Sequence, residues 1–446
     1  MIPLPRWRDR KVRVVGLGPA GRAAAAALAA AGAEVTVWDD DAERRAAQSA
    51  ALGLPAKGPR ASLSGLDAVV LCDGALAAAT KALLPKARAS GVPLLTDFDL
   101  FAAALDTGAD DAPRVVGVTG AAGKSVTVRM IAQACTAAGR RVHVASDTPC
   151  LALPAPRGGD TYVIEMPPGR LAATRRFACD VAVVLEMGAA KGGLDAAMRA
   201  VTRLVRHQRD GGATIIAADD GLGAKLCAAL QGGAVRSGEV IPVSSEAALG
   251  HGVFVLGHQA YAARDGRTQS IGDLSRAVAI QAPHLALDAA AAIAAGLSLG
   301  LSPPVIVKAL HDLEPASGRF APLGSKGRVL IVDDSRARLP HSVEKALAAT
   351  PDAFWVTTAQ APELTASSLR GTYRFGEDTP YGGLAEGLDA ALAEAEALAA
   401  RDPQAAPVVL FAPCGPTEPG AFARLVAERI DAPQAGGGQG AEAAHG

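Results

Sequence analysis

The chain has 446 residues, half of them hydrophobic, which is enough for about three domains that each bury a core. Its 44 Lys and Arg residues balance 45 Asp and Glu residues, so there is no overall basic field to hold a nucleic acid or an anionic membrane. We therefore expect no nucleic-acid partner, and any polyanion must bind at a local site.

Composition also indicates the fold class and the compartment. The 49 glycines and an aromatic fraction of only 4% favour an α/β fold with many tight turns over an aromatic-rich β-sandwich. The six cysteines show no C-x-x-C spacing, which is typical of reduced thiols. No segment reaches about 18 consecutive apolar residues, so we expect no membrane insertion and a cytoplasmic protein.

A strand, a glycine-rich turn and a helix open the chain. Val12–Val15 has the pattern of a buried strand, and Gly16-Leu17-Gly18-Pro19-Ala20-Gly21 leads into an Ala-rich helix that ends near Ala30. The strand Glu34–Trp38 then ends at Asp39, about 20 residues past the glycines, where an acid can bind a ribose hydroxyl. This pattern alone would also fit a dinucleotide-dependent oxidoreductase, but no catalytic acid or base accompanies it.

Further alternation of strands and helices completes a first domain. We expect a strand at Ala68–Leu71, a helix at Ala75–Ser90 and a strand at Leu94–Asp97. The polar stretch Asp106–Pro113 then has the composition of a linker. The first domain is therefore predicted to span residues 1–110.

A second glycine loop carries the clearest chemistry. The strand Val115–Val118 precedes Gly120-Ala121-Ala122-Gly123-Lys124-Ser125-Val126, and a helix follows to about Ala138. Such a loop offers a triphosphate backbone N–H groups, a helix N-terminus, a lysine charge and a hydroxyl for Mg²⁺. The strict G-x-x-x-x-G-K-[ST] pattern is missed because Val118 stands where its first glycine belongs. We predict that ATP and Mg²⁺ bind at this loop.

The remaining elements predict a central domain, a third domain and a tail. Alternating strands and helices favour parallel sheets wound on both faces, and thus Rossmann-like domains at either end of a P-loop ATPase-like centre. The central domain is predicted at residues 111–302, the third at 303–430, and a disordered tail at 431–446. The expected strands are Thr161–Glu165, Val181–Leu185, Thr214–Ala218, Val329–Val332, Phe354–Thr357 and Val408–Phe411, and the expected helices are Ala286–Leu297 and Gly383–Ala400.

Several segments, in the same order along the chain, resemble the Mur ligases. TGAAGKSVT is similar to the family's phosphate loop, YVIE ending at Glu165 to its metal-binding strand, and GRF followed by VLIVDDSRA to the start of its third domain. GLGPAG with Asp39 and the later LLTDFDLF are similar to the UDP-binding domain of the D-glutamate-adding members. The resemblance covers residues 1–430 and implies a monomer of three domains for UDP-sugar, ATP and amino-acid binding.

The resemblance also implies a reaction and the residues that carry it. Mur ligases form an amide bond through an acyl phosphate, joining an amino acid to a UDP-linked muramoyl substrate of peptidoglycan synthesis. It implies that Lys124 holds the β- and γ-phosphates and acts in catalysis with Glu165, and that Ser125 and Glu165 ligate Mg²⁺. Arg319 and Asp334 would reach ATP from the third domain. Gly16, Leu17, Gly18 and Asp39 would contact the UDP-sugar.

Several family positions are replaced, so a second hypothesis stays open. Glu186–Lys191 lacks the family's metal-binding His, and Arg203 or Leu204 stands near its carbamylated Lys. The other departures are Ala122, Arg170, Leu285 and Asp288 after His284, Arg336 with Arg338 and Leu339, and Cys72-Asp73-Gly74. Arg170, Lys191 and Arg203 could supply fixed cations in place of a metal. The alternative is a catalytically impaired relative that binds a nucleotide or UDP-sugar and acts through partners.

Overall fold

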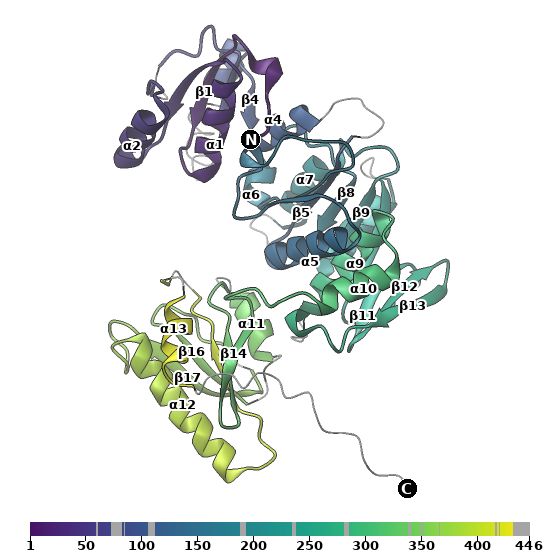
Figure 1. Cartoon of the computed structure of the whole chain (residues 1–446), viewed down its shortest axis with the longest axis vertical. Coiled ribbons are helices and arrows are strands. Elements are labelled where there is room, and N and C mark those ends of the chain that lie inside the picture. The colour runs from purple at the N-terminus through teal and green to yellow at the C-terminus, as the bar shows by residue number, and fades with distance from the viewer. Residues whose placement is uncertain are drawn as a thin grey trace. The chain divides into compact units, whose positions relative to one another are not determined.

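The computed structural model describes residues 1–58, 61–72, 83, 85–105, 112–187, 193–233, 238–280, 285–337, 340–348, 350, 352–364, 366–414, 417–418 and 420–430. These residues form two compact units, one from Met1–Ala277 with Leu285–Leu313, and a second that consists mainly of the chain from Glu314 onward. The described strands make three separate sheets, two in the first unit and one in the second (Figure 1). The predicted α/β class with parallel sheets is confirmed.

The first sheet is entirely parallel. Its strands run in the order β2-β1-β3-β4, which places β1 between β2 and β3. Val12 and Val14 of β1 belong to the core that also holds α1, whereas Val15 packs on the other face. The elements are β1 (Lys11–Val15), α1 (Pro19–Ala30), β2 (Glu34–Trp38), α2 (Ala42–Leu52), β3 (Ala68–Leu71), β4 (Leu94–Thr96) and α4 (Asp97–Leu105).

Helix α4 joins the first sheet to the central one. The predicted strand ends one residue early, at Thr96, and Asp97 begins the helix. Its Phe101 ring lies 5.5 Å from the ring of Tyr162 on the central sheet, in an edge-on arrangement. The Asp99 carboxylate accepts hydrogen bonds from the backbone N–H groups of Arg175 and Arg176 at 2.8 and 2.7 Å. The two sheets of the first unit therefore share one hydrophobic core.

The central sheet has nine strands in the order β13-β12-β11-β10-β9-β8-β5-β7-β6. The strands from β6 to β11 are parallel, and the hairpin β12–β13 is antiparallel. The strands are β5 (Arg114–Thr119), β6 (Val142–Ala145), β7 (Thr161–Glu165), β8 (Val181–Val184), β9 (Ala213–Ala217), β10 (Glu239–Ser244), β11 (Gly252–Leu256), β12 (Gln259–Arg264) and β13 (Arg267–Asp273).

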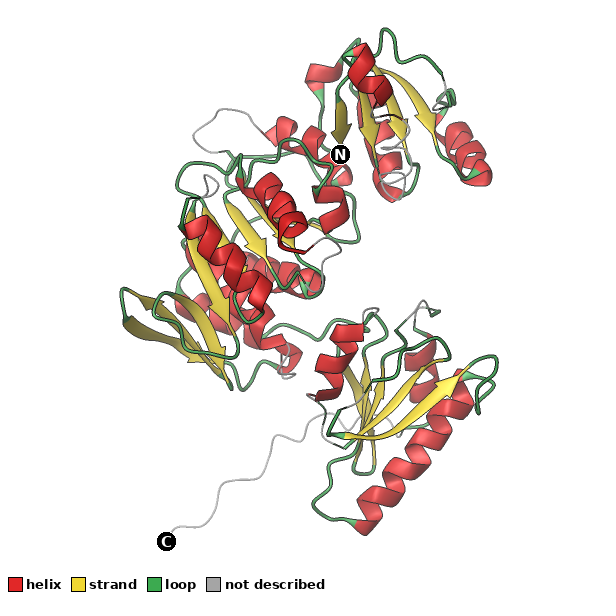
Figure 2. Ribbon diagram, turned by 180° about the vertical axis from the view of Figure 1, so that it is seen from behind, coloured by secondary structure: helices red, strands yellow, loops and turns green. Residues whose placement is uncertain are grey.

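Two groups of helices cover this sheet, as Figure 2 shows. Helices α5, α9 and α10 contact one another, and α7 contacts both α6 and α8, which is the pattern of a sheet wound on both faces. Helix α10 packs on α5 and on β13, and it belongs to the first unit, whereas the chain from Glu314 onward belongs to the second. The helices are α5 (Lys124–Ala137), α6 (Pro168–Leu171), α7 (Gly193–Val205), α8 (Gly221–Gln231), α9 (Ala286–Ser298) and α10 (Pro303–His311).

The second unit is built on a five-stranded sheet in the order β14-β15-β18-β16-β17, in which only the pairing of β14 with β15 is antiparallel. Trp355 and Leu410 face α11, whereas Phe354 and Val409 face α12 and α13, because neighbouring residues of a strand point to opposite faces. The elements are β14 (Ala321–Lys326), β15 (Val329–Asp333), α11 (Pro340–Ala348), β16 (Ala353–Thr358), β17 (Leu369–Phe375), α12 (Leu384–Arg401), β18 (Val408–Phe411) and α13 (Ala421–Ala427).

Some predictions fall partly outside the described residues. Of the helix expected at Ala75–Ser90, residues 83 and 85–90 are described and helical, and the tail from 431 lies outside. All six cysteines are free, and all except Cys414 are buried. Burial raises the thiol pKa of Cys150 and Cys179, as expected for small core residues. Among the helices that the structure describes, none is long and apolar enough to cross a membrane.

Candidate functional site

The loop Gly120–Ser125 lies where the order of the central sheet reverses. It follows β5, whose two neighbours are β7 on one side and β8 on the other. The chain passes from β5 to β7 by way of β6, and only afterwards to β8 on the opposite side. In open parallel sheets this switch point, at the carboxyl ends of the strands, is where ligands bind.

Two glycines shape the loop. Gly120 has φ 146° and Gly123 has φ 76°, and residues other than glycine rarely adopt such positive φ angles. A Cβ on Gly120 would lie 2.7 Å from the Cβ of Leu185, so the loop packs closely on the segment after β8. There the Ala121 N–H donates to the Glu186 carbonyl at 2.7 Å. Helix α5 begins directly after Gly123, and its N-terminus therefore points at the loop.

Lys124 turns back over the loop that it follows. Its Nζ donates hydrogen bonds to the carbonyl oxygens of Gly120 and Ala121, at 2.9 and 3.3 Å. The side chain is half-buried, and so are Ala122 and Ser125, while the Val126 side chain points into the core. An ammonium group at the N-terminus of a helix is unfavourable unless an anion is near, and a bound phosphate group would be one such anion.

Ser125 and Glu165 are in direct contact, although 40 positions separate them in the sequence. The Ser125 hydroxyl donates to Oε2 of Glu165 at 2.8 Å. Glu165 ends β7, the strand next to β5, so the parallel register brings its carboxylate to the start of α5. A hydroxyl and a carboxylate are hard oxygen donors of the kind that Mg²⁺ prefers. The donor set therefore fits the predicted metal.

Ser146 is a member of this cluster that the sequence did not reveal. It follows β6, and its hydroxyl donates to the same Oε2 of Glu165 at 2.6 Å. The carboxylate is therefore held from two sides, by Ser125 of the loop and by Ser146 of the neighbouring strand. In the sequence, the only indication of its role was a polar residue at the end of a short strand, and that strand, β6, was not predicted.

In the first sheet the predicted UDP-sugar residues form a second loop. Gly16 has φ 89°, and a Cβ on Gly21 would lie 1.7 Å from the carbonyl oxygen of Gly16. This turn therefore requires glycine at both positions. Asp39 is buried and accepts a hydrogen bond from the Leu17 N–H at 2.6 Å. Arg44 lies 3.5 Å from the same carboxylate oxygen. Asp39 thus fixes the shape of the loop, and its contact with a sugar remains a prediction.

In the second unit Asp334 lies just past β15 at the carboxyl edge of the sheet. The Phe320 N–H donates to its Oδ1 at 3.1 Å, which joins the Gly-Arg-Phe turn to the start of the domain. Burial raises the pKa of Asp334 to about 7, although the Phe320 N–H and the charge of Arg319 act in the opposite direction. The two predicted ATP contacts of this domain, Arg319 and Asp334, are therefore neighbours.

Arg170 does not supply a free cation to the phosphate loop. It makes an ion pair with the buried Asp97, and its Cζ lies 4.3 Å from the ring centroid of Phe98. Arg203 is exposed on α7, and Leu204 beside it is buried. Asp73, Gly74, Lys191, His284, Arg338 and Leu339 lie outside the described residues. Within the described part, no group of three or more His, Cys, Asp and Glu side chains could hold a metal by itself.

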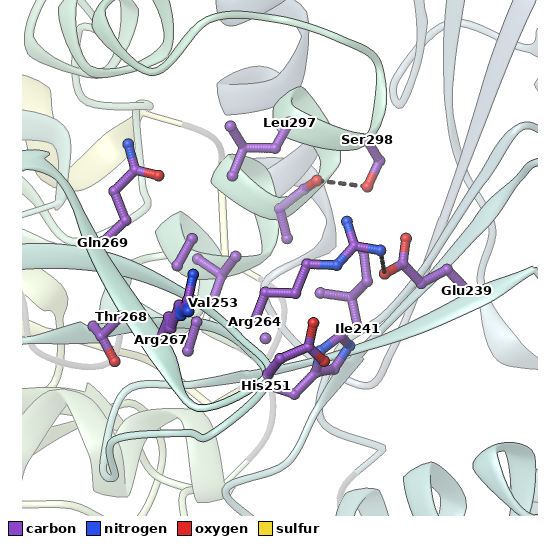
Figure 3. Close-up of a pocket in the computed structure, with 15 residues that line it drawn as sticks. Glu239, Ile241, His251, Val253, Arg264, Arg267, Thr268, Gln269, Leu297 and Ser298 are labelled. Carbon is purple, nitrogen blue, oxygen red and sulfur yellow. Dashed lines mark hydrogen bonds and ion pairs between the residues drawn. The ribbon is translucent and has the colours of Figure 1, made fainter.

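A cavity of about 830 Å³ lies at the other end of the central sheet (Figure 3). It is lined by the first residues of β10 and β11, by the β12–β13 hairpin and by the last turn of α9. Arg264 and Glu239 form an ion pair at 3.5 Å across it. The phosphate loop instead lies at the strands' carboxyl ends, near the first turn of α9. The cavity is therefore separate from the predicted nucleotide site.

This fold and this site define a class: doubly wound α/β proteins with a glycine-rich loop at the switch point of the central sheet. Comparison with models of protein families finds no match. The UDP-N-acetylmuramoylalanine–D-glutamate ligase of Phenylobacterium zucineum (strain HLK1) is 32% identical over 366 residues, which cover 80% of this chain and 77% of that protein. The enzyme of the same name from Rhizobium meliloti (strain 1021) is 28% identical over 442 residues, 93% of each chain.

Solved structures agree in fold. MurF from Acinetobacter baumannii superposes with a TM-score of 0.53 at 19% identity, covering 83% of this chain and 92% of that one. The UDP-N-acetylmuramate–alanine ligase MurC from Thermotoga maritima gives 0.51 at 17% identity, covering 94% and 98%. The chain belongs to the Mur ligase family, among the relatives of UDP-N-acetylmuramoylalanine–D-glutamate ligase. The resemblance inferred from the motifs is thus confirmed.

Proposed function

We propose that this protein is an ATP-dependent ligase of peptidoglycan precursor synthesis, which joins an amino acid to a UDP-linked muramoyl substrate. The observation that carries the proposal is that Lys124, Ser125 and Glu165 lie together at the switch point of the central sheet. Relatives named as UDP-N-acetylmuramoylalanine–D-glutamate ligases support the choice of reaction. In this proposal the protein acts in the cytoplasm as a monomer, with UDP-sugar, ATP and amino-acid domains at 1–110, 111–302 and 303–430.

The chain's own residues have distinct tasks in this reaction. The N-terminus of α5 and the backbone N–H groups of the loop bind the phosphates of ATP. Lys124 exchanges its two loop carbonyls for the β- and γ-phosphates, so its charge meets the oxygens that become more negative during transfer. Ser125 and Glu165 would hold Mg²⁺, which supplies positive charge at the transferred phosphoryl group. Arg319 and Asp334 contact the nucleotide from the third domain.

Substrate recognition is proposed for the two outer domains. The turn Gly16–Gly18, fixed by Asp39, presents backbone N–H groups for the UDP-sugar. On the amino-acid side, Arg336 follows Ser335 where the family has a lysine, and no lysine follows Thr358. Specificity for D-glutamate is therefore not part of the proposal. An acidic amino acid fits an exposed arginine through a bidentate ion pair.

Phosphate release tests the proposal and the choice of amino acid together. Purified protein is given ATP, Mg²⁺ and UDP-N-acetylmuramoyl-L-alanine, and each amino acid is added in turn. We expect release that depends on both the UDP-linked substrate and one class of amino acid. Measurable ATP binding without release for any amino acid would contradict the ligase and favour the non-catalytic alternative.

A further inference from the structure

The first turn of α9 places a carboxylate against the phosphate loop. Asp288 is the third residue of that helix, and only 6% of it is exposed. A Cβ built on Gly123 would lie 2.1 Å from Oδ1 of Asp288 and 2.9 Å from Oδ2. Helix α5 begins at the next residue, Lys124. One carboxylate therefore lies at the N-terminal ends of two helices.

This position has a structural benefit. The N-terminus of a helix carries a partial positive charge, so an acid in the first turn of α9 stabilises that helix. The same carboxylate faces the N-terminus of α5 through Gly123, whose missing side chain allows the close approach. Asp288 therefore acts as a built-in anion for both helix ends.

The same position has a cost for a ligand. The N-terminus of α5 is the group that a bound phosphate would use, and the carboxylate already occupies part of its field. Two further charges at this loop are the Lys124 ammonium group and the Glu165 carboxylate. Repulsion between a buried carboxylate and a nearby phosphate group is strong, because little water screens it.

We propose that Asp288 sets the nucleotide affinity of this site, by opposing the phosphate groups that the loop and Lys124 attract. This inference rests on the proposed nucleotide binding and adds a residue that limits its strength. The electrostatic repulsion from Asp288 acts on the phosphate groups of the nucleotide and not on its base. It therefore grows with the number of phosphates that the nucleotide carries.

Calorimetry on the full chain tests this with Asp288→Asn, which keeps the shape and removes the charge. Titrations use ATP, ADP, AMP and adenosine under identical salt. We expect Asp288→Asn to bind ATP at least about tenfold more tightly than the wild type, with a smaller gain for AMP and none for adenosine. A purely structural role in α9 would lower thermal stability and would not produce this dependence on phosphate number.

The matched control is Glu239→Gln, which removes one negative charge at the amino end of β10, whereas the loop lies at the carboxyl end of β5. It should leave all four affinities unchanged. Equal ATP affinity in the wild type and in Asp288→Asn would overturn the inference, and so would an equal gain for ATP and adenosine. If wild type and variant both fold but neither binds ATP, the proposed function fails, and this inference with it.

Discussion

At the scale of single residues, Lys124 carries the charge on which nucleotide binding depends. Replacing it by alanine removes the ammonium group while leaving the loop glycines in place, so the phosphates lose their main counter-charge. We expect Lys124→Ala to weaken ATP binding by about 100-fold or more, because a hydrogen bond to a charged group contributes strongly to affinity. Calorimetry measures the change in Kd. Lys225→Ala, on the exposed face of α8, is the control. Unchanged affinity in Lys124→Ala would place the nucleotide elsewhere.

Ser146 gives a second prediction at this scale. Its hydroxyl holds Oε2 of Glu165 opposite Ser125, so its loss should leave the carboxylate less fixed. We expect Ser146→Ala to weaken Mn²⁺ binding in the presence of ATP by about tenfold, measured as free Mn²⁺ by electron paramagnetic resonance. Ser146→Thr retains the hydroxyl and should keep most of the affinity. Loss of affinity in Ser146→Thr but not in Ser146→Ala would contradict a positioning role.

Asp334 predicts a pH dependence of stability in the second unit. Because burial raises its pKa to about 7, the folded state keeps a proton that the unfolded state releases between about pH 4 and pH 7. The stabilising effect of that proton is complete below about pH 4 and is lost as the pH rises to 7. We therefore expect the free energy of unfolding of Asp334→Asn, minus that of the wild type, to become more positive by roughly 2–4 kcal/mol as the pH rises from 4 to 7.

Trp355 reports on this transition because it is fully buried in the same sheet. With Trp7 and Trp38 replaced by Phe, denaturant unfolding followed by fluorescence isolates the second unit. A difference between Asp334→Asn and its parent that does not change from pH 4 to pH 8 would show that Asp334 is ionised throughout.

At the scale of elements, the structures predicted most accurately from the sequence are those whose whole pattern lies within one short segment. The turns Gly16–Gly21 and Gly120–Ser125 each follow a buried strand and open a helix, and both form as expected. Strand β6 and the hairpin β12–β13 were not predicted, since their short alternating patterns resemble loops. Ser146 was missed because the register of the sheet, not local spacing, brings it to Glu165. Asp288 was recognised only as a replaced family position, and the packing of α9 on α5 brings it to the loop.

The junction between α4 and α6 allows a prediction about an element pair. Asp97 and Arg170 form a buried ion pair, and removing one partner leaves an uncompensated charge. We expect Arg170→Met to destabilise the first unit by about 3–5 kcal/mol. The double variant Asp97→Ala with Arg170→Met should recover much of that loss. Denaturant unfolding followed by Trp7 and Trp38, with Trp355 replaced by Phe, measures both, and equal losses in the single and double variants would contradict the pairing.

At the scale of the whole molecule, the sequence predicted three α/β regions, and the structure has three separate sheets. The first two share a hydrophobic core through α4 and form one compact unit, which a linear reading of the sequence could not anticipate. Aromatic contacts such as that between Phe101 and Tyr162 join segments 61 positions apart and have no local signature. The substrate sites of the outer domains remain predictions because the replaced positions carry no recognisable pattern.

Formation of the amide product itself would show whether this protein is a ligase. Wild-type protein and Lys124→Ala are incubated with ATP, Mg²⁺, UDP-N-acetylmuramoyl-L-alanine and an amino acid mixture, and the UDP-linked products are weighed by mass spectrometry. We expect a product heavier by one amino acid residue, one ADP for each amide bond, and no product with Lys124→Ala. An unchanged UDP-linked substrate in the presence of bound ATP would contradict this expectation.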